Sequence, residues 1–459
     1  MTTTKTPGRW MRGLLVAGTM ALLLSCGGGG GGSATTLPAG TGSGTAASGT
    51  DAGGGGTGAD GTGTGTGTGA SGTSGTDGGT STAGNSTGDG SGVGSGGTGV
   101  TADAAGIGGV DGLGSVILNG LRYNTDSAAF SLEDTTELQI GMSARIAGKV
   151  DADFTSGTAT QVVSAAELRG TVSGIDTAAG TFVVMGSTVT TDTATVWGAG
   201  ATNGVADLVA GSSVVQVWGL PAAPGTLRAT RIQLQPASAE PLATGTVQNL
   251  QPLQKTFMLG LLKVDYSAAV LSSGIDAATL ANGVIVRVRG TQAPVAGNFT
   301  ATKVQGWYAV PGSDGVAVQL AGVITDFVSR SGFRVLGTPI DATNAQITGG
   351  PAISLGNGVK VEVDGFMTGG VLVVKKLRIR YVPGTGGPAS FTVIGPIHSY
   401  HSSADFRIHD QQVDASGSGT IFENGTVADL SNPQQRATIV GDRIFNGVLI
   451  AQRVTFTVP

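Results

Sequence analysis

The sequence predicts an all-β protein, a tandem array of about five small β-barrel modules that follows a disordered Gly/Thr/Ser tether. Three observations lead to this prediction. Short segments alternate between apolar and polar residues, β-branched residues dominate them, and glycines recur between them at hairpin spacing. Strands that each bury one face favour a small closed barrel, because closure removes the exposed edges of a flat sheet.

The N-terminus reads as an export signal. Basic residues precede an apolar run at 13–24 that is too short to span a bilayer as a helix. The run ends in Leu-Leu-Ser-Cys, which resembles a bacterial lipobox with Cys26 as the acylated residue. We therefore expect a lipoprotein signal peptide at 1–25 and lipidation of Cys26. The alternative is an ordinary secretory signal with an incidental cysteine.

The residue after the cysteine bears on location. In diderm bacteria an aspartate after the lipidated cysteine resembles a signal for retention in the inner membrane. This chain has Gly27 at that position, which favours the outer membrane. Several acyl chains on Cys26 would supply the strong anchoring that one chain does not provide. We expect a lipid-anchored protein of the bacterial cell envelope, on either the periplasmic or the surface face. Cys26 is the only cysteine, so an intramolecular disulfide is excluded.

Residues 26–104 are almost entirely Gly, Thr, Ser, Ala and Asp. This composition offers no apolar side chains for a core, so we expect a disordered tether. A coil of this length has a root-mean-square span of roughly 50 Å and a stretched length on the order of 250 Å. The tether would hold the folded part away from its anchor.

Internal repeats organise the rest of the chain. Each repeat has a turn residue between two short strands, glycine in the first four copies and Asp410 in the last, and an alternating strand that ends in a closing glycine. Closing glycines at positions 148, 219, 290, 365 and 441 lie 71, 71, 75 and 76 residues apart. We therefore expect β modules at 105–169, 170–236, 245–307, 322–382 and 395–459.

The segment Gly358–Gly365 shows how these strands are built. Its three valines fall on one face, whereas Lys360, Glu362 and Asp364 fall on the other, so one face should be buried and one wet. In the fifth module Asn432-Pro433 replaces the opening glycine. Prolines lie in the joints between modules and stiffen them, so we expect the modules to follow one another in a semi-rigid rod.

The clearest repeat, Gly170–Leu234, carries a family resemblance. The turn Asp176-Thr-Ala-Ala-Gly180, the strand that begins Thr181-Phe-Val-Val, the segment Val205-Ala-Asp-Leu and the segment Ala229-Thr-Arg-Ile232 resemble bacterial exported proteins described as domain of unknown function 5666. The resemblance implies small all-β units on lipoproteins. It implies no activity, and it supplies no catalytic residues.

Charge argues against nucleic acid as a partner. Without the three basic residues of the leader, 22 basic residues face 30 acidic ones, a formal charge of about −8. Small barrels that bind single-stranded nucleic acid need a basic groove with stacking aromatic residues, and aromatic residues make up 5% of this chain. We interpret the densest basic run, residues 375–380, as a solvated strand face.

All three histidines lie in the last module. A hairpin that turns near Ser402 would set His409 opposite His398, close enough to share a metal ion, whereas His401 should face the other way. These three residues are the candidate metal ligands. The alternative is that they are exposed turn and strand residues.

An aspartate recurs after the second strand of several modules. It is Asp265, Asp341 and Asp414, with Asn124 in the first module. Because the residue repeats in each copy, we interpret it as a turn residue rather than as part of an active site.

The sequence favours a non-enzymatic function. The first four modules lack histidine, which excludes a Ser-His-acid triad there. A match to the dinucleotide fingerprint at Gly92–Gly97 follows no strand and opens no helix, so we do not interpret it as a cofactor site. We expect an envelope lipoprotein that presents repeated β modules to a glycan or another envelope protein, with the membrane contacted through its lipid. The alternative is a metal-binding or redox-accessory protein that uses the histidines of the last module.

Overall fold

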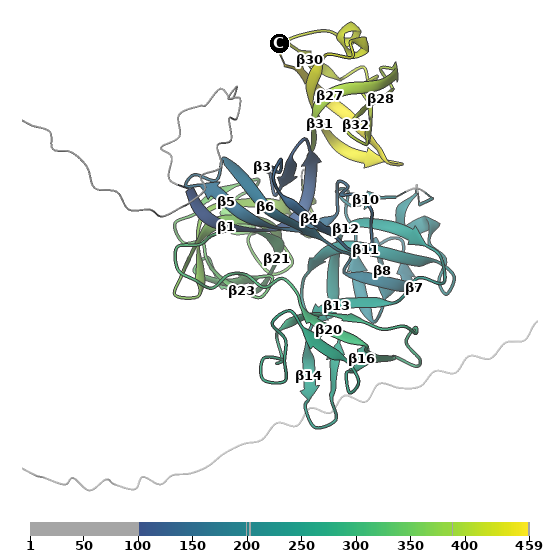
Figure 1. The fold of residues 1–459 in the computed structure, drawn as a ribbon, viewed down its shortest axis with the longest axis vertical. Coiled ribbons are helices and arrows are strands. Elements are labelled where there is room, and N and C mark those ends of the chain that lie inside the picture. Colours follow the sequence, from purple (N-terminus) through teal and green to yellow (C-terminus); the bar gives the residue numbers. More distant parts are fainter. Residues whose placement is uncertain (1–100, 199, 202, 388, 458–459) are drawn as a thin grey trace, which may run out of the picture. The chain divides into compact units, whose positions relative to one another are not determined.

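The repeats fold into rings of β-strands in the computed structural model, which describes residues 101–457 except 199, 202 and 388 (Figure 1). The described residues belong to one unit, Gly90–Pro459. The predicted signal peptide, Cys26 and the predicted tether as far as residue 100 lie outside the described residues. Within the described residues, the helical segments are short 3₁₀ turns, and none is long and apolar enough to cross a membrane.

Barrel 4 illustrates the ring. Its first strand, β21 (Ala317–Ser329), pairs with β22 (Gly332–Val335), which pairs with β23 (Thr338–Asp341). β23 runs parallel to β26 (Val371–Tyr381), which pairs with β25 (Lys360–Thr368), and β25 returns to β21. This order closes a five-stranded Greek-key barrel. The predicted all-β class is confirmed.

The same order recurs along the described chain. Barrel 1 contains β1 (Thr101–Leu113), β2 (Val116–Leu118), β3 (Leu121–Asn124), β4 (Ala129–Leu132), β5 (Ser143–Asp151) and β6 (Ser156–Ser164). Barrel 2 contains β7 (Leu168–Asp176), β8 (Thr181–Val184), β9 (Ser187–Thr190), β10 (Val196–Trp197), η1 (Gly204–Asp207), β11 (Val214–Pro221) and β12 (Thr226–Gln235). In barrel 3 the first and last strands are each split in two.

Barrel 3 contains β13 (Leu242–Thr246), β14 (Gln248–Gln251), β15 (Thr256–Leu259), β16 (Leu262–Asp265), β17 (Val270–Ser272), β18 (Ile285–Arg289), β19 (Asn298–Thr300) and β20 (Lys303–Gly306). Barrel 4 adds β24 (Gln346–Thr348) and η2 (Ala352–Ser354) to the ring above. Barrel 5 contains β27 (Phe391–Ser402), β28 (Asp405–Ile408), β29 (Gln411–Asp414), β30 (Ile421–Glu423), η3 (Val427–Ser431), β31 (Arg436–Phe445) and β32 (Val448–Phe456).

The opening glycines of the repeats attach the fourth strand to the first. In barrels 1 to 4 the glycine N–H donates to a first-strand carbonyl over 2.8–3.0 Å, from a backbone with positive φ that favours glycine. These residues are Gly141, Gly211, Gly283 and Gly358. Barrel 5 lacks the glycine, but it keeps the return bond from its first strand, in which Ile397 donates to Gln435.

The closing glycines lie where the fourth strand meets the fifth. A Cβ atom at each would come within 2.0–2.6 Å of a carbonyl oxygen of the fifth strand, which no side chain tolerates. At four of them the pairing register also shifts by a β-bulge: Gly148, Gly219, Gly365 and Gly441. The repeated glycines therefore mark the bend that closes each ring.

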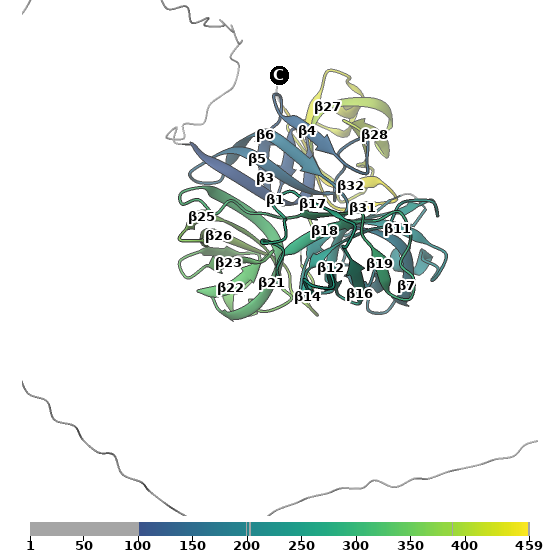
Figure 2. The ribbon, with the colours of Figure 1, turned by 60° about the horizontal axis from the view of Figure 1, so that its bottom comes forward.

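The barrels do not follow one another in a simple row. β1 pairs with β5 of its own barrel, and also runs parallel to β21 of barrel 4 and to β27 of barrel 5 (Figure 2). A rod in which each module touches only its neighbours in the sequence is therefore wrong. β1 also begins at Thr101, so strand structure starts before the predicted end of the tether at residue 104, because residues 101–104 already pair with β5.

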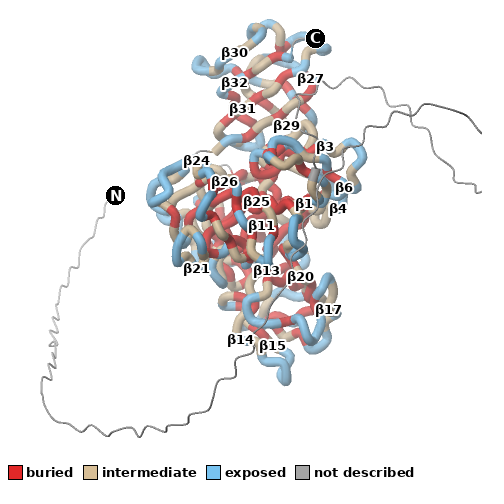
Figure 3. Tube along the Cα trace, turned by 90° about the vertical axis from the view of Figure 1, so that its left-hand side faces the viewer, coloured by how far each residue is buried: buried red, intermediate tan, exposed pale blue. Residues whose placement is uncertain are grey.

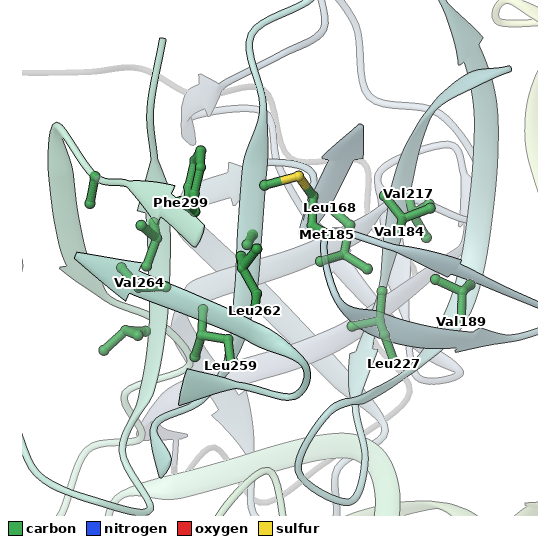
Figure 4. Close-up of a cluster of buried hydrophobic side chains, with 14 of the residues drawn as sticks. Leu168, Val184, Met185, Val189, Val217, Leu227, Leu259, Leu262, Val264 and Phe299 are labelled. Carbon is green, nitrogen blue, oxygen red and sulfur yellow. The ribbon is translucent and has the colours of Figure 1, made fainter. Parts of the chain in front are cut away.

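Buried residues lie along the strands of the barrels, and exposed residues concentrate in the turns (Figure 3). Barrels 2 and 3 do not have separate cores. One cluster of buried residues runs from Leu168 through Met185 to Leu262 and Phe299, across both barrels (Figure 4). Leu261 also donates its N–H to the carbonyl of Gly186 over 2.9 Å. Small modules bury little surface alone, so sharing a core stabilises both.

The predicted wet face of β25 is also covered. Glu362 and Asp364 are buried, 4% and 1% exposed, because barrel 1 packs over them. Arg378 pairs with both carboxylates and donates to the carbonyl of Asn119 in barrel 1 over 2.8 Å. Alternation identified the two faces correctly, but the polar face forms a contact between barrels.

Candidate functional site

A groove lies where barrels 2, 3 and 4 meet. Its volume is about 950 Å³, at the upper end of the range for small-molecule sites. Barrel 2 contributes the turn 221–226, barrel 3 contributes Thr246 and the loop at 282–283, and barrel 4 contributes residues 323–326 and Leu336. The groove exists only because these three barrels pack together.

One wall of the groove is a stacked pair of side chains. The guanidinium carbon of Arg228 in β12 lies 3.8 Å from the centroid of the Tyr381 ring at the end of β26. Arg228 also donates twice to one carboxylate oxygen of Asp192, over 2.6 and 2.9 Å. The ring and the guanidinium are thereby held in fixed positions before any ligand arrives.

Two equivalent asparagines supply amide groups. Asn282 and Asn357 each precede an opening glycine, and each accepts a backbone N–H through Oδ1 over 2.9 Å, from Leu250 and Phe327. This bond fixes the side chain and leaves its NH₂ to donate elsewhere. Thr246 and Thr325 add hydroxyl groups to the same lining.

The charges in the groove are balanced. Arg228 is paired with Asp192, and Arg334 lies 3.7 Å from Asp326. Between these polar groups the lining is formed by proline, alanine and aliphatic side chains. A ligand that suits this lining is uncharged, rich in hydroxyl groups, and has apolar faces.

A buried polar cluster ties the barrels together behind the groove. Glu167, 1% exposed, accepts hydrogen bonds from Tyr308 over 2.5 Å, from Ser143 over 2.8 Å and from the N–H of Gly219 over 2.8 Å. Burial raises the pKa of Glu167 to about 7, despite these donors. The pKa of Tyr308 is also raised well above its usual value. Burial is the larger cause, and the negative charge of the nearby Glu167 is the second.

A second cluster joins barrel 1 to barrels 2 and 3. Asp134, in the loop after β4, forms ion pairs with Arg169, Arg287 and Arg289. Burial pushes the pKa of Asp134 upward, but the three arginines lower it overall. The guanidinium of Arg287 also lies 4.7 Å from the centroid of the Trp307 ring. These contacts hold barrel 1 against barrels 2 and 3, which are two of the three barrels that form the groove.

The histidines are not brought together as predicted. His398 pairs with Arg407, whereas His409 occupies the turn between β28 and β29 with φ of 52° and contacts the carbonyl of Ile394 through Nε2 over 2.9 Å. The predicted register is wrong because the β27–β28 pairing shifts between His398 and Ser402. His401 lies 3.6 Å from Asp405 on the surface.

No group of three or more His, Cys, Asp or Glu residues suited to a metal ion occurs in the part of the chain that the structure describes. The structure therefore gives no support to a metal site in the last module.

The recurring aspartates form turns. Asp265, Asp341 and Asp414 each accept the backbone N–H of the residue two positions later through Oδ1, over 2.8–2.9 Å, and Asn124 does the same. Their interpretation as turn residues is confirmed.

The basic run at 375–380 is not a free solvated face. Lys375 and Lys376 donate to backbone carbonyls of barrel 1, and Arg380 pairs with Glu362 over 2.7 Å. These contacts have no sequence signal, because they depend on which barrels pack together.

Sequence reasoning also missed the groove residues. Asn282 and Asn357 each precede an opening glycine, and this repeated position is the signal that marks them. Arg228 lies three residues before Arg231, and the equivalent residues of the next two repeats are Thr300 and Val373, so no repeated position marks it. Their convergence with Tyr381 from a different repeat could not be read from periodicity.

Comparison with known proteins identifies the repeat. The family model described as Domain of unknown function (DUF5666) matches residues 169–233, 244–305 and 321–376, which lie in barrels 2, 3 and 4. No curated protein and no solved structure gives a significant match. The strand order of the matched barrels also occurs in barrels 1 and 5. Three segments of the chain therefore match DUF5666, which is consistent with a DUF5666 repeat protein.

Proposed function

We propose that this protein is a non-enzymatic, lipid-anchored binding protein of the bacterial cell envelope, and that the groove between barrels 2, 3 and 4 binds an uncharged glycan. The observation that supports the ligand class is the charge-balanced lining, in which amide and hydroxyl groups surround an aromatic ring and proline faces. Sugars combine hydroxyl groups with apolar ring faces, so both parts of the lining find partners.

The N-terminal sequence supports the location. A basic leader, an apolar run and Cys26 in a lipobox-like segment favour lipid anchoring, and Gly27 favours the outer membrane. A Cys26→Ser variant should lose metabolic labelling with palmitate and leave the membrane fraction. Retention of both properties in the variant would contradict the proposed anchor. The alternative metal-binding role has no supporting observation among the described residues.

Glycan binding is tested by calorimetry on the full mature chain carrying Cys26→Ser, which keeps it free of lipid. Maltose, cellobiose and diacetylchitobiose are the neutral probes, and polygalacturonate is the anionic one. We expect at least one neutral sugar to bind and to be recovered unchanged. Binding of polygalacturonate alone, or of no sugar, would overturn the proposal and leave a protein partner to be sought.

A matched pair of variants locates the site. Ala223 is exposed in the turn of barrel 2 that lines the groove, whereas Ala237 is exposed in the linker after β12, outside it. Ala223→Trp should fill the groove and weaken sugar binding at least tenfold, while Ala237→Trp should bind as the parent does. Equal affinities for both variants would exclude the groove as the site.

A further inference from the structure

A second cavity adjoins the groove at the seam between barrels 3 and 4. Its volume is about 460 Å³. Four residues line both cavities: Gly283 and Ile285 from barrel 3, and Leu336 and Gly337 from barrel 4. The two cavities therefore meet at a waist formed by the side chains of Ile285 and Leu336.

The two cavities differ in chemistry. The groove carries the arginines and asparagines described above, whereas the lining of the second cavity contains no charged side chain. Its side chains are mainly aliphatic, with Ile275, Val284, Val310 and Met367 among them. The two cavities therefore differ in charge and in their aliphatic side chains rather than in the share of polar surface along the seam.

The aromatic residue Trp307 does not make the second cavity a site for stacking a sugar. It lines the second cavity and is 6% exposed. The guanidinium carbons of Arg145 and Arg287 lie 4.0 and 4.7 Å from the centroid of its ring. The ring is thus engaged by protein cations and acts as a wall of the second cavity rather than as a platform for stacking a sugar.

We infer that the ligand is amphiphilic, an uncharged glycan head in the groove that carries an alkyl chain in the second cavity. The head-group part of this inference rests on the proposed function. The chain part rests on the aliphatic, uncharged lining and on the shared waist. Burying an apolar chain there removes its surface from water, which supplies affinity that hydrogen bonds to a sugar alone provide poorly.

The test is a chain-length series on the full mature chain carrying Cys26→Ser. Maltose is compared by calorimetry with octyl, decyl and dodecyl maltoside, each below its micelle concentration. We expect the affinity to rise by about fourfold for each buried methylene until the cavity is filled. The same affinity for maltose and all three maltosides would overturn the amphiphile inference and leave glycan binding intact.

A change of head group separates the two proposals. Dodecylphosphocholine has a similar chain with a zwitterionic head. If it binds as tightly as dodecyl maltoside, the chain inference stands and the glycan proposal fails. If neither maltose nor any maltoside binds, the chain inference fails, and the glycan proposal also fails when cellobiose and diacetylchitobiose do not bind either.

A further variant locates the chain. Ala309 is exposed and lines the second cavity but not the groove. Ala309→Trp should abolish the gain with chain length and leave maltose affinity unchanged, with Ala237→Trp as the matched control. Maltose binding by the variant verifies its fold, so a persisting chain-length gain would overturn the placement.

Discussion

The guanidinium carbon of Arg228 lies 3.8 Å from the centroid of the Tyr381 ring, so a side chain of barrel 2 covers an aromatic ring of barrel 4. The two residues are far apart in the sequence, and they meet because β1 of barrel 1 draws barrel 4 back toward the earlier barrels through its pairing with β21. The groove therefore depends on the pairing of β1 with β21.

Arg228→Lys tests the contact. Lysine keeps the charge, but it lacks the planar group that stacks on Tyr381 and donates twice to Asp192. We expect a loss of about 1 kcal/mol in the free energy of unfolding, measured by denaturant titration, and weaker sugar binding. Arg334→Lys is the control for stability, since Arg334 is half-exposed and its pair is long. Equal losses in the two variants would contradict the special role of the stack.

The pH dependence of stability follows from Glu167. Its pKa is near 4.5 in the unfolded chain and is raised to about 7 by burial. Between these values the folded protein holds a proton that the unfolded chain has lost, so the free energy of unfolding falls as the pH rises through this window. The fall levels off above about pH 7 and is on the order of 3 kcal/mol.

Glu167→Gln should remove this part of the slope, because glutamine does not titrate. Asp111, whose pKa burial also raises to about 7, contributes a slope of the same sign. The Glu167→Gln variant should therefore retain a partial slope that Asp111→Asn removes. Denaturant titrations at pH 5, 6 and 7 measure it, and a stability that rises with pH in the parent would contradict both assignments.

Asp134→Asn should separate barrel 1 from barrels 2 and 3. The carboxylate is paired with three arginines, and its side chain is 7% exposed. Removing its charge leaves Arg169 without a carboxylate partner and leaves Arg287 and Arg289 paired with Glu133 alone. We therefore expect a loss of about 3 kcal/mol in the free energy of unfolding. Asp326→Asn, at an exposed pair, should cost less than about 0.5 kcal/mol. Similar midpoints of thermal unfolding for the two variants would argue against the junction.

Gly365→Ala tests the closing glycines. A Cβ atom there would come within 2.2 Å of the carbonyl oxygen of Val373, so barrel 4 should lose its closure and the protein should fold poorly. Gly356→Ala is the matched control, because no atom lies within 4 Å of its Cβ position. Circular dichroism and limited proteolysis of both variants provide the measurement. A well-folded Gly365→Ala protein would show that the bulge tolerates a side chain.

Local features of the fold were readable from the repeat pattern. Alternation in Gly358–Gly365 predicted a strand with two distinct faces, and the recurrent aspartates predicted turns, because strand period and side-chain capping act over a few residues. The closing glycines were found by spacing alone, and the structure supplies their reason in the bulge. The candidate site was not predictable to the same degree, since its residues come from three repeats.

The histidines show where local reasoning fails. A regular hairpin that turns near Ser402 would place His409 on a strand opposite His398. In the structure the pairing moves by two residues between Ser402 and His398, so that His398 lies opposite Arg407, and His409 lies in the two-residue turn after β28. A single pattern carries no information on such bulges.

The sequence by itself determined the strands, their hairpins and the closure of each ring, because periodicity, turn residues and glycine sterics act within one repeat. Only the tertiary structure decided which barrels touch, that barrels 2 and 3 share one core, and that Arg228 and Tyr381 meet across a groove. Small barrels stabilise one another by burying apolar and ionic surfaces at their contacts, and repeats with the same strand pattern present many such surfaces. The choice among them depends on the complementarity of whole surfaces rather than on any local pattern.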